Sequence, residues 1–296
     1  MRLAATATDE RAIRLYDATA ARASRTVLAA YSTSFRLGSR LLGSRGRADI
    51  EAVYALVRIA DEIVDTRRGS DAGALLDELE GQTVRALGSG YSTNLVVHAF
   101  AATARRTGIG RAELDPFFAS MRTDLTVRVH DRASYESYVH GSAEVVGLMC
   151  LAVFLNADSA PGEPVRHGDR RLTTGAQALG AAFQKINFLR DLGADSAGLG
   201  RSYFPGVQRG SLTRAQLDPI LAEIGADLEV ARAAVPGLPW RARCAVAATL
   251  GLYEKLLDQL AKTAPADVLT QRIRVATPRK IAVVARAVAG QAGRRA

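Results

Sequence analysis

Apolar side chains recur along most of this chain every three or four residues, which is the spacing of one face of an α-helix. No stretch alternates apolar and polar positions as a β-strand does, and we find neither an internal repeat nor a clear domain linker. The pattern predicts an all-α protein of roughly ten helices or more. The predicted helices cover about residues 26–42, 47–66, 71–87, 93–107, 111–125, 132–156, 180–195, 213–224 and 240–262, and a last one begins near residue 277.

Two boundaries follow from local signals. Thr213 followed by Gln216 predicts a capping box at the start of one helix. We expect residues 1–24 to form a polar, Ala- and Arg-rich arm, and residues 25–296 to form a single domain.

The segment from Gly180 to Pro205, GAAFQKINFLRDLGADSAGLGRSYFP, carries the most informative pattern. On a helical wheel of about 100° per residue, one stripe of small and polar residues falls within about 80°. Its members are Gly180, Gln184, Asn187, Asp191 and Asp195. A solvent-exposed face is usually wider and carries long charged side chains. The narrow stripe therefore indicates a helix face turned toward a cavity that holds a cation, and the tail GLGRSYFP is expected to be an ordered flap.

The predicted helix over residues 47–66 supplies a second acidic pair. Asp61 and Asp65 lie one turn apart, opposite an apolar stripe that runs from Val53 to Val64. Taken alone, this face is as consistent with a solvated acidic surface as with a binding site. Aspartate is a poorer helix former than glutamate, so its use at both i and i+4 favours a specific role.

The two acidic helices together indicate a class of chemistry. If they face each other, four carboxylates share one space, and their mutual repulsion requires a cation. Oxygen ligands without His or Cys suit Mg²⁺, with Mn²⁺ as an alternative. Arg58 lies one turn before Asp61, Arg190 adjoins Asp191, and Arg201 lies in the flap segment. Carboxylates with a divalent cation and flanking arginines suit a diphosphate.

Other phosphate and carboxylate chemistries fit less well. The chain lacks the glycine-rich phosphate loop of nucleotide hydrolases. Paired carboxylates also occur in glycosidases, but i,i+4 aspartates on two apolar helices suit a metal cluster better than an acid–base pair.

Two clusters of small residues admit two interpretations. Ser32, Ser34 and Gly38 occur in the predicted helix over residues 26–42, and Gly141–Gly147 lies within the one over residues 132–156. Such residues either contact a ligand or allow neighbouring helices to pack closely, and their spacing alone does not decide between the two.

The charge of the chain favours anionic partners. The formal net charge is +9 with a pI near 10.0, and only four of the 39 basic residues are Lys. An Arg bias also arises in a GC-rich genome; the functional alternatives are a phosphate-rich substrate, an anionic membrane surface or nucleic acid. No Lys/Arg-rich block with interleaved aromatic residues is present, which argues against nucleic acid.

Neither the cysteines nor the apolar runs indicate export or a membrane span. Cys150 and Cys244 lie in apolar helical surroundings and are expected to be buried thiols. The N-terminus is charged too early for a secretory signal, and the longest apolar run, Val145–Leu155, is too short to span a bilayer. We expect a cytoplasmic protein with at most a peripheral contact on the inner face of an anionic membrane.

The four histidines show no metal-ligand spacing, so none is assigned a role.

Five stretches of the chain resemble, in order, the squalene/phytoene synthase family of head-to-head prenyltransferases. The stretches are YSTSFRLGSRLL, YALVRIADEIVD, GSAEVVGLM, QKINFLRDLGAD with GRSYFP, and RIRVATPRK, and they span about residues 27–285. The resemblance implies an isoprenoid-synthase-type helical bundle with a central apolar cavity, in which residues 25–296 form the catalytic domain. It also implies Mg²⁺-dependent joining of two prenyl diphosphates, with geranylgeranyl diphosphate favoured over farnesyl diphosphate and NADPH not expected.

The resemblance also implies roles for particular residues. The metal ligands would be Asp61, Asp65, Asn187, Asp191 and Asp195. The residues that contact or surround the diphosphates would be Ser32, Ser34, Phe35, Tyr54, Arg58, Gln184, Arg190, Arg201, Tyr203, Tyr253 and Arg272. Tyr138, Ala143 and Gly147 would border the hydrocarbon cavity, and Tyr138 and the released diphosphate are candidate acceptors of the final proton. For Tyr203, Tyr253 and Arg272 a surface or packing role stays open.

Some positions depart from the usual family pattern. Glu62 stands where many members have Asp, Ile186 replaces a common Thr, Ala194 replaces a common acid, and the flap is about one residue longer. None of these changes removes an expected metal ligand. A squalene or dehydrosqualene synthase that uses farnesyl diphosphate is the alternative enzyme, and a non-catalytic assembly protein on the same fold is the alternative of another class. The sequence leaves the oligomeric state and the number of metal ions undetermined.

Overall fold

The computed structural model describes residues 7–66, 71–160, 162–198, 201–208, 210–270, 273 and 276–292. Within these ranges, the side chains of Ala7, Ser34, Asp191, residues 193–198, residues 277–279, residue 281 and Ala292 are not described. The predicted residue Arg272 lies outside the described residues.

The described chain is helical, as the hydrophobic pattern predicts, and its other regular structure is limited to one isolated parallel β-bridge between Val129 and Ser202. The helices are α1 (Ala7–Tyr31), α2 (Thr33–Ser39), α3 (Ser44–Asp65), α4 (Ala72–Ser89), α5 (Leu95–Thr107), α6 (Arg111–Thr126), α7 (Arg132–Val139), the π-helical turn η1 (His140–Glu144), α8 (Val145–Asn156), α9 (Arg170–Gly198), α10 (Arg214–Ala234), the 3₁₀ turn η2 (Val235–Gly237), α11 (Trp240–Lys262), α12 (Pro265–Thr270) and α13 (Thr277–Ala292).

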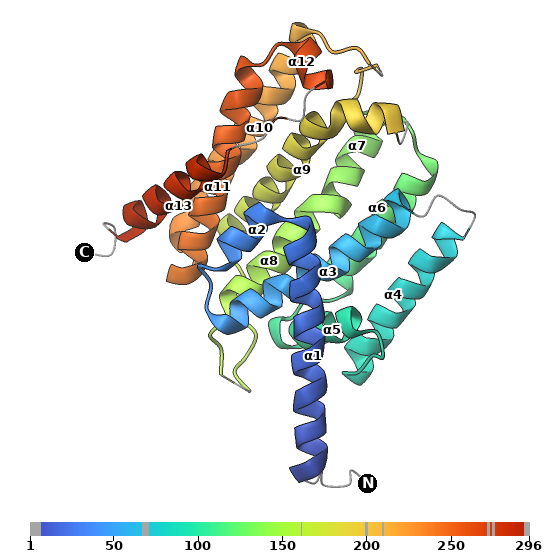
Figure 1. The fold of residues 1–296 in the computed structure, drawn as a ribbon, viewed down its shortest axis with the longest axis vertical. Coiled ribbons are helices and arrows are strands. Elements are labelled where there is room, and N and C mark those ends of the chain that lie inside the picture. Colours follow the sequence, from blue (N-terminus) through green and yellow to red (C-terminus); the bar gives the residue numbers. More distant parts are fainter. Residues whose placement is uncertain are drawn as a thin grey trace.

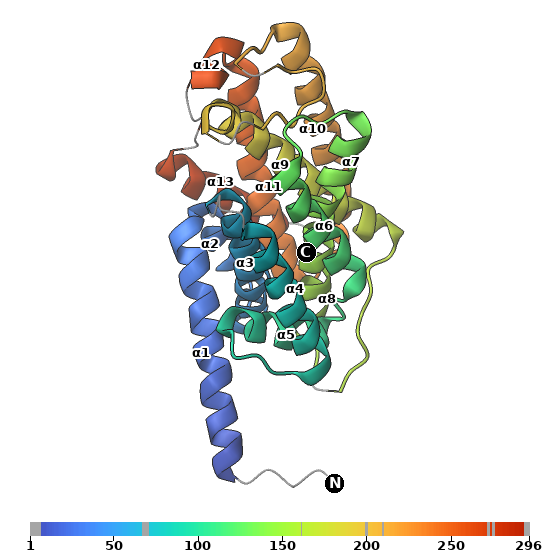
Figure 2. The same cartoon turned by 90° about the vertical axis from the view of Figure 1, so that its right-hand side faces the viewer.

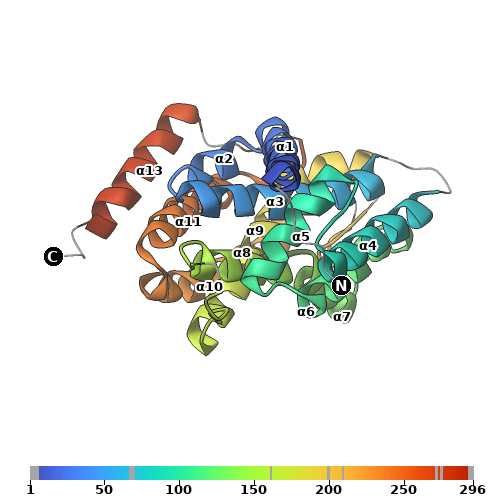
Figure 3. The same cartoon turned by 90° about the horizontal axis from the view of Figure 1, so that it is seen from below.

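Helix α9 lies at the centre of the bundle (Figure 1). It packs against α8, α10 and η1, and it also contacts α11. One continuous apolar core extends from α3 through α6, α8 and α9 to α11, and includes fully buried Leu56, Phe117, Met149 and Leu189. Helix α13 lies at the outer edge of the bundle against α11 (Figure 3). The core therefore surrounds the helix that carries the second aspartate pair.

The N-terminal part of the chain differs from its predicted boundaries. One helix was expected over residues 26–42, but the backbone becomes extended at Ser32, with φ −141° and ψ 109°. The Ser32 hydroxyl accepts a hydrogen bond from the amide of Phe35 at 3.2 Å, so Ser32 caps α2 and separates it from α1. A serine can satisfy an exposed amide at a helix start, and this local bond outweighs the apolar periodicity.

Helix α1 runs along the surface, and its N-terminal end projects beyond the bundle (Figures 1 and 2). It passes residue 24 without a break. Ala20 is fully buried against Ala52 of α3 and Ala99 of α5. The division of the chain at residue 24 stays a prediction.

The predicted helix over residues 132–156 is interrupted by the π-helical turn η1. At Gly141, a Cβ atom would overlap the Pro116 carbonyl of α6, so this close approach requires glycine. A π-helical turn re-aims the side chains that follow it, and such turns occur often at functional sites. The stretch Arg132–Asn156 is also the one helical stretch among the described residues that is long and apolar enough to cross a membrane, but half of it is buried inside the molecule, as in a core helix.

The central helices are longer than their patterns suggested. Helix α9 extends from Arg170 to Gly198, beyond the sixteen residues from Gly180 whose pattern predicts a helix, and α10 ends at Ala234 instead of near residue 224. The capping box of α10 is confirmed, because Gln216 N donates to Thr213 Oγ1 at 3.3 Å and Thr213 N donates to Gln216 Oε1 at 2.9 Å. Short α12 was not predicted.

Candidate functional site

A cavity of about 470 Å³ lies between α2, α3, α8, α9 and α11. Eleven of the residues to which the family resemblance gives a role line it, and they come from α2, its cap, α3, η1, α8, α9 and α11. They are Ser32, Phe35, Tyr54, Arg58, Asp61, Ala143, Gly147, Gln184, Asn187, Arg190 and Tyr253. The far end of the cavity is lined mainly by apolar side chains of α8 to α11, such as Leu151, Phe154, Leu172 and Val235. The cavity therefore has a charged end and an apolar end.

The charged end is built by one face of α3. Tyr54, Arg58, Asp61 and Asp65 are spaced so that they fall within about 60° of one another around the helix. The first three line the cavity, whereas Asp65, one turn further along α3, does not. The Arg58 guanidinium lies 4.0 Å from the Asp61 carboxylate and forms an ion pair with Glu62. These contacts keep a guanidinium beside the first acidic pair. Glu62, which departs from the usual family pattern, is the ion-pair partner of Arg58.

Tyr31, at the end of α1, holds the same arginine from the other side. The guanidinium carbon of Arg58 lies 4.4 Å from the centre of the Tyr31 ring, in a cation–π contact. Tyr31 also lines the cavity. The helix break at Ser32 thus places both an aromatic face and a hydroxyl at the charged end.

Asp61 lies in a strongly perturbed electrostatic environment. Burial, together with the nearby carboxylates of Asp65 and Asp124, raises the pKa of its carboxyl to about 7 against the opposing effect of Arg58 and Arg201. The ionised carboxylate is therefore destabilised in the protein alone, and a cation at this position would relieve the destabilisation.

The face of α9 across the cavity supplies further polar groups. Gln184, Asn187 and Arg190 line the cavity, and Lys185 points away from it to ion pairs with Glu223 and Asp227 of α10 at 2.6 and 2.7 Å. The Asn187 Oδ1 atom is buried and has no hydrogen-bond partner among the described residues. Buried polar atoms are nearly always bonded, so an unbonded amide oxygen in a cavity suggests a ligand.

The donors at the charged end fit a hard divalent cation. The Asp61 carboxylate and the Asn187 amide oxygen are both oxygen ligands of the kind that Mg²⁺ accepts. Among the described side chains no group of three or more His, Cys, Asp or Glu residues could hold a metal ion. Asp191 and Asp195 lie on α9, but their side chains are outside the description. The predicted meeting of the two aspartate pairs thus stays a prediction.

Arg201 of the flap segment lies beside the end of α3 and is almost fully buried. Its Nη1 donates to Asp65 Oδ1 at 2.6 Å, and its Nη2 donates to the carbonyls of Val64 at 3.1 Å and Asp124 at 3.0 Å. The flap is thereby tied to the C-terminal turn of α3 and to α6. Arg201 is held beside Asp65, the second aspartate of the first pair, but Arg201 does not line the cavity.

Three further groups complete this buried cluster. Tyr138 Oη donates to Asp124 Oδ2 at 2.6 Å, and Tyr203 Oη donates to Asp124 Oδ1 at 3.4 Å. The Tyr203 ring stacks on Phe188 of α9, with ring centres 4.0 Å apart. Burial raises the pKa of Tyr138 well above its ordinary value, so the phenol stays protonated. Tyr203 is therefore a buried residue, not a surface one.

Asp124 is a buried carboxylate of this cluster that the sequence analysis missed. It shares the buried face of α6 with Phe117 and Met121, at i−7 and i−3. A carboxylate on an apolar stripe requires a partner, so its position was a usable signal. The partners come from α7 and the flap, which the local pattern of α6 could not identify.

The small residues of η1, α8 and α9 serve close packing and also border the cavity. A Cβ atom on Gly147 would overlap the Ala176 carbonyl, and one on Gly180 would overlap the Ala143 carbonyl. All four residues line the cavity. Both interpretations of these residues are thus consistent with the structure.

Aromatic side chains cover part of the cavity wall. Phe183 of α9 and Tyr253 of α11 stack with ring centres 3.7 Å apart, and Phe35 meets Phe183 edge to face at 6.1 Å. Cys150 also lines the cavity, and both cysteines are free thiols. Tyr253 is therefore part of the cavity wall.

Comparison with known proteins gives a consistent result. The profile of the squalene/phytoene synthase family matches residues 28–279. A phytoene synthase of Mycobacterium tuberculosis is 29% identical over 275 residues, covering 86% of each chain, and one of Arthrospira platensis is 29% identical over 286 residues, covering 87% of this chain and 88% of its own. A solved dehydrosqualene synthase with a ligand superposes with a TM-score of 0.79 at 21% identity, covering 94% of this chain and 98% of its own. A squalene synthase of Alicyclobacillus acidocaldarius gives a TM-score of 0.72 at 20% identity, covering 84% and 95%.

Proposed function

The chain belongs to the squalene/phytoene synthase family, whose enzymes transfer prenyl groups from prenyl diphosphates, and we propose that it is a phytoene synthase. In this proposal two geranylgeranyl diphosphates join head to head, with release of one diphosphate and one proton, to give a cyclopropylcarbinyl diphosphate. Ionisation of that intermediate releases the second diphosphate, and rearrangement with loss of a proton yields phytoene for carotenoid synthesis. The curated relatives named phytoene synthase support the twenty-carbon substrate. The observation that carries the proposal is the placement of Asp61 and Arg58 at one end of a cavity with an apolar far end.

The basic residues at the charged end would bind the leaving group. Arg58 and Arg190 line the cavity from α3 and α9 and would neutralise diphosphate oxygens as the allylic C–O bond breaks. Ser32, Gln184 and Tyr54 lie at the same end and would donate hydrogen bonds to those oxygens. The family depends on a divalent metal, and a bound Mg²⁺ would supply further charge neutralisation at the diphosphate.

The residues that would hold Mg²⁺ are the first aspartate pair with Asn187, together with Asp191 and Asp195. The destabilised carboxylate of Asp61 and the unbonded Asn187 oxygen support this assignment. The proposal needs no NADPH, because phytoene forms by proton loss and not by hydride addition.

The apolar end would protect the carbocation. Helices α8 to α11 line it with aliphatic side chains, which exclude water from the cation after ionisation. The stacked rings of Phe183 and Tyr253 present π faces near the charged end, where they would stabilise positive charge. Ala143 and Gly147 leave room for the hydrocarbon beside η1 and α8.

Tyr138 and the released diphosphate are the candidates for accepting the last proton. Tyr138 is a neutral phenol that already donates its hydrogen to Asp124. It could therefore accept a proton only if its own moved to Asp124 at the same time. The released diphosphate carries no such requirement.

The test is a product analysis. Purified protein with Mg²⁺ is incubated with geranylgeranyl or farnesyl diphosphate, each with and without NADPH, and the hydrocarbon is identified by mass. We expect phytoene from geranylgeranyl diphosphate without NADPH. Squalene or dehydrosqualene from farnesyl diphosphate alone would identify the alternative enzyme, and no hydrocarbon from either substrate would favour a non-catalytic assembly protein.

Two variants connect the product to the site. Asp61→Asn and Asp191→Ala should abolish product while the circular dichroism spectrum and the melting temperature stay close to wild type. Asp77→Asn is the matched control, because Asp77 pairs with Arg122 on the α4–α6 surface, away from the cavity. Normal turnover by Asp191→Ala would contradict the metal assignment.

A further inference from the structure

Asp124 lies at the centre of a buried polar cluster that joins three separate parts of the chain. It is 4% exposed, and its side chain accepts from Tyr138 of α7 at 2.6 Å and from Tyr203 of the flap at 3.4 Å. Its backbone carbonyl accepts from Arg201 Nη2 at 3.0 Å. A single residue of α6 therefore contacts both α7, the helix that leads into the cavity-lining turn η1, and the flap segment that is bound to the end of α3.

Arg201 connects this cluster to Asp65 of the first aspartate pair. The guanidinium is 3% exposed and lies between Asp124, whose Oδ1 is 3.5 Å from Nε, and Asp65, whose Oδ1 is 2.6 Å from Nη1. A buried guanidinium is stabilised by paired carboxylates together with hydrogen bonds to its remaining N–H groups. A neutral side chain at position 124 would leave Asp65 as the only one of these two carboxylates paired with Arg201, which would weaken the attachment of Arg201 to α6.

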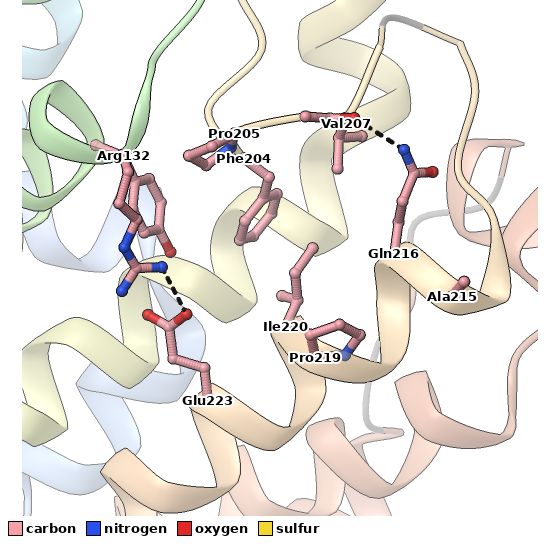
Figure 4. A pocket seen from close by; sticks show the side chains of 11 residues that line it. Arg132, Phe204, Pro205, Val207, Ala215, Gln216, Pro219, Ile220 and Glu223 are labelled. Atoms are coloured by element: carbon pink, nitrogen blue, oxygen red, sulfur yellow. Dashed lines mark hydrogen bonds and ion pairs between the residues drawn. The ribbon is translucent and has the colours of Figure 1, made fainter.

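The flap is fixed on its outer side by independent contacts. Figure 4 shows Phe204 and Pro205 of the flap, and Val207 just after it, beside Pro219 and Ile220 of α10, around a pocket of about 320 Å³. The Gln216 amide donates to the Gly206 carbonyl at 2.8 Å. Ser202 pairs with the strand-like segment before α7 through a bond to the Arg128 carbonyl at 2.8 Å. These contacts hold the flap near the bundle, but none of them reaches Asp65.

We propose that Asp124 is a positioning residue that holds Tyr138, Tyr203 and Arg201 in register, so that the flap arginine is kept against Asp65, one turn along α3 from the cavity-lining Asp61. Its effect on turnover rests on the proposed function, whereas its effect on the flap does not. Asp124 touches no substrate in this proposal and acts through Arg201 and Tyr138. A displacement of about 1 Å in such a supporting group can cost about 100-fold in rate.

The experiment compares Asp124→Asn, Asp124→Leu and the control Asp49→Asn. Asp49 is also a buried aspartate, 5% exposed, and pairs with Arg106 and Thr103 far from the flap. The first measurement is amide hydrogen exchange by mass spectrometry of the metal-free protein, read on peptides that contain residues 201–207. We expect faster exchange there in both Asp124 variants, with Leu faster than Asn, and wild-type exchange in Asp49→Asn at a comparable loss of melting temperature.

The second measurement is kinetic. We expect kcat/KM to fall by about 100-fold in Asp124→Leu and by less in Asp124→Asn, which keeps an acceptor for Tyr138. In a Tyr138→Phe background the cost of Asp124→Asn should shrink, because the two residues act as a unit. Unchanged flap exchange in Asp124→Asn, or equal acceleration in Asp49→Asn, would overturn the positioning role. If Asp124→Leu does not fold, the comparison of Asp124→Asn with wild type tests the proposal. If wild-type protein forms no hydrocarbon, the proposed function is wrong, and the hydrogen-exchange data still decide the role of Asp124.

Discussion

Arg201 Nη1 donates to Asp65 Oδ1 at 2.6 Å and joins the flap segment to the last turn of α3. The sequence placed these two residues 136 positions apart, in separate motifs. Their pairing means that Asp65, in the first aspartate-rich motif, is oriented by Arg201, which lies in the flap at the end of the second motif. The flap is therefore joined to the acidic face of α3 beside the cavity, and is not merely a cover over it.

Replacing Arg201 should be costly for both stability and activity. Arg201→Met leaves the buried Asp124 and the partly exposed Asp65 side chains without their cation, and removing one partner of a buried ion pair costs about 3–5 kcal/mol. We expect that loss in urea unfolding, together with loss of product formation by the fraction that remains folded.

Lys185→Met is the matched control for Arg201→Met. Lys185 is also a buried cation between two carboxylates, but it faces Glu223 and Asp227 of α10 and does not line the cavity. The free energy of unfolding should fall by a similar amount, while turnover per folded molecule stays near wild type. Equal loss of turnover in both variants would show that Arg201 acts only through stability.

The raised pKa of Asp61 predicts that metal binding weakens in mild acid. Burial and neighbouring carboxylates raise this pKa to about 7 in the protein alone, so a proton competes with the cation below that pH. Between pH 7 and pH 6 the Mg²⁺ concentration for half-maximal activity should rise by about fivefold from this one group. An unchanged half-saturation concentration would contradict the assignment of Asp61 as a ligand.

The same group gives a prediction for the protein without metal. A carboxyl whose folded pKa lies above its unfolded value contributes stability at low pH, and this contribution is lost as the pH rises through the folded pKa, here about 7. Compared with Asp61→Asn, metal-free wild-type protein should therefore lose melting temperature between pH 6 and pH 8. Added Mg²⁺ should remove that difference, which differential scanning fluorimetry can measure.

The helix faces of the site could be predicted from the sequence because they depend only on local spacing. Tyr54, Arg58 and Asp61 share one face of α3 wherever that helix packs, and Gln184 and Asn187 share one face of α9 for the same reason. Which faces meet across a cavity follows from tertiary packing, which the spacing does not contain. The family resemblance supplied that information for the residues within its motifs.

Other features depend on contacts between distant segments and could not be predicted in the same way. The π-helical turn at His140–Glu144 accompanies the approach of Gly141 to the Pro116 carbonyl of another helix. The cap at Ser32 was hidden because its neighbours keep an apolar helical period. Asp124 was visible as a carboxylate on an apolar face, but its partners Tyr138 and Arg201 belong to other elements.

Close packing of α9 against η1 predicts a strong effect at Gly180. A Cβ atom there would overlap the Ala143 carbonyl, so Gly180→Ala forces α9 away from η1 and should cost about 1–3 kcal/mol. The cavity would change shape with it, and KM for the prenyl diphosphate should rise. Gly225→Ala is the control, because a Cβ on this α10 glycine meets nothing within 4 Å and should stabilise the helix by up to about 1 kcal/mol. A neutral Gly180→Ala would show that the helices can separate without cost.

Tyr253 offers a test of whether the aromatic wall contacts the diphosphate or only packs. Its ring stacks on Phe183 with an interplanar angle of 16°, and both side chains line the cavity. Tyr253→Phe keeps the ring and removes only the hydroxyl. A lost hydrogen bond to a charged group costs about 1.5–3 kcal/mol, so KM should rise by about tenfold or more with the melting temperature unchanged, if that hydroxyl meets the diphosphate as the family resemblance implies.

Tyr253→Leu separates the two contributions of this side chain. Loss of the stack with Phe183 should lower the melting temperature, and loss of a π face near the cation should lower kcat in addition to the effect on KM. Steady-state kinetics of both variants with geranylgeranyl diphosphate, beside thermal unfolding, make the comparison. If Tyr253→Phe has wild-type kinetics and Tyr253→Leu is destabilised, Tyr253 serves packing alone. The diphosphate contacts would then come from Arg58, Arg190 and the α3 face.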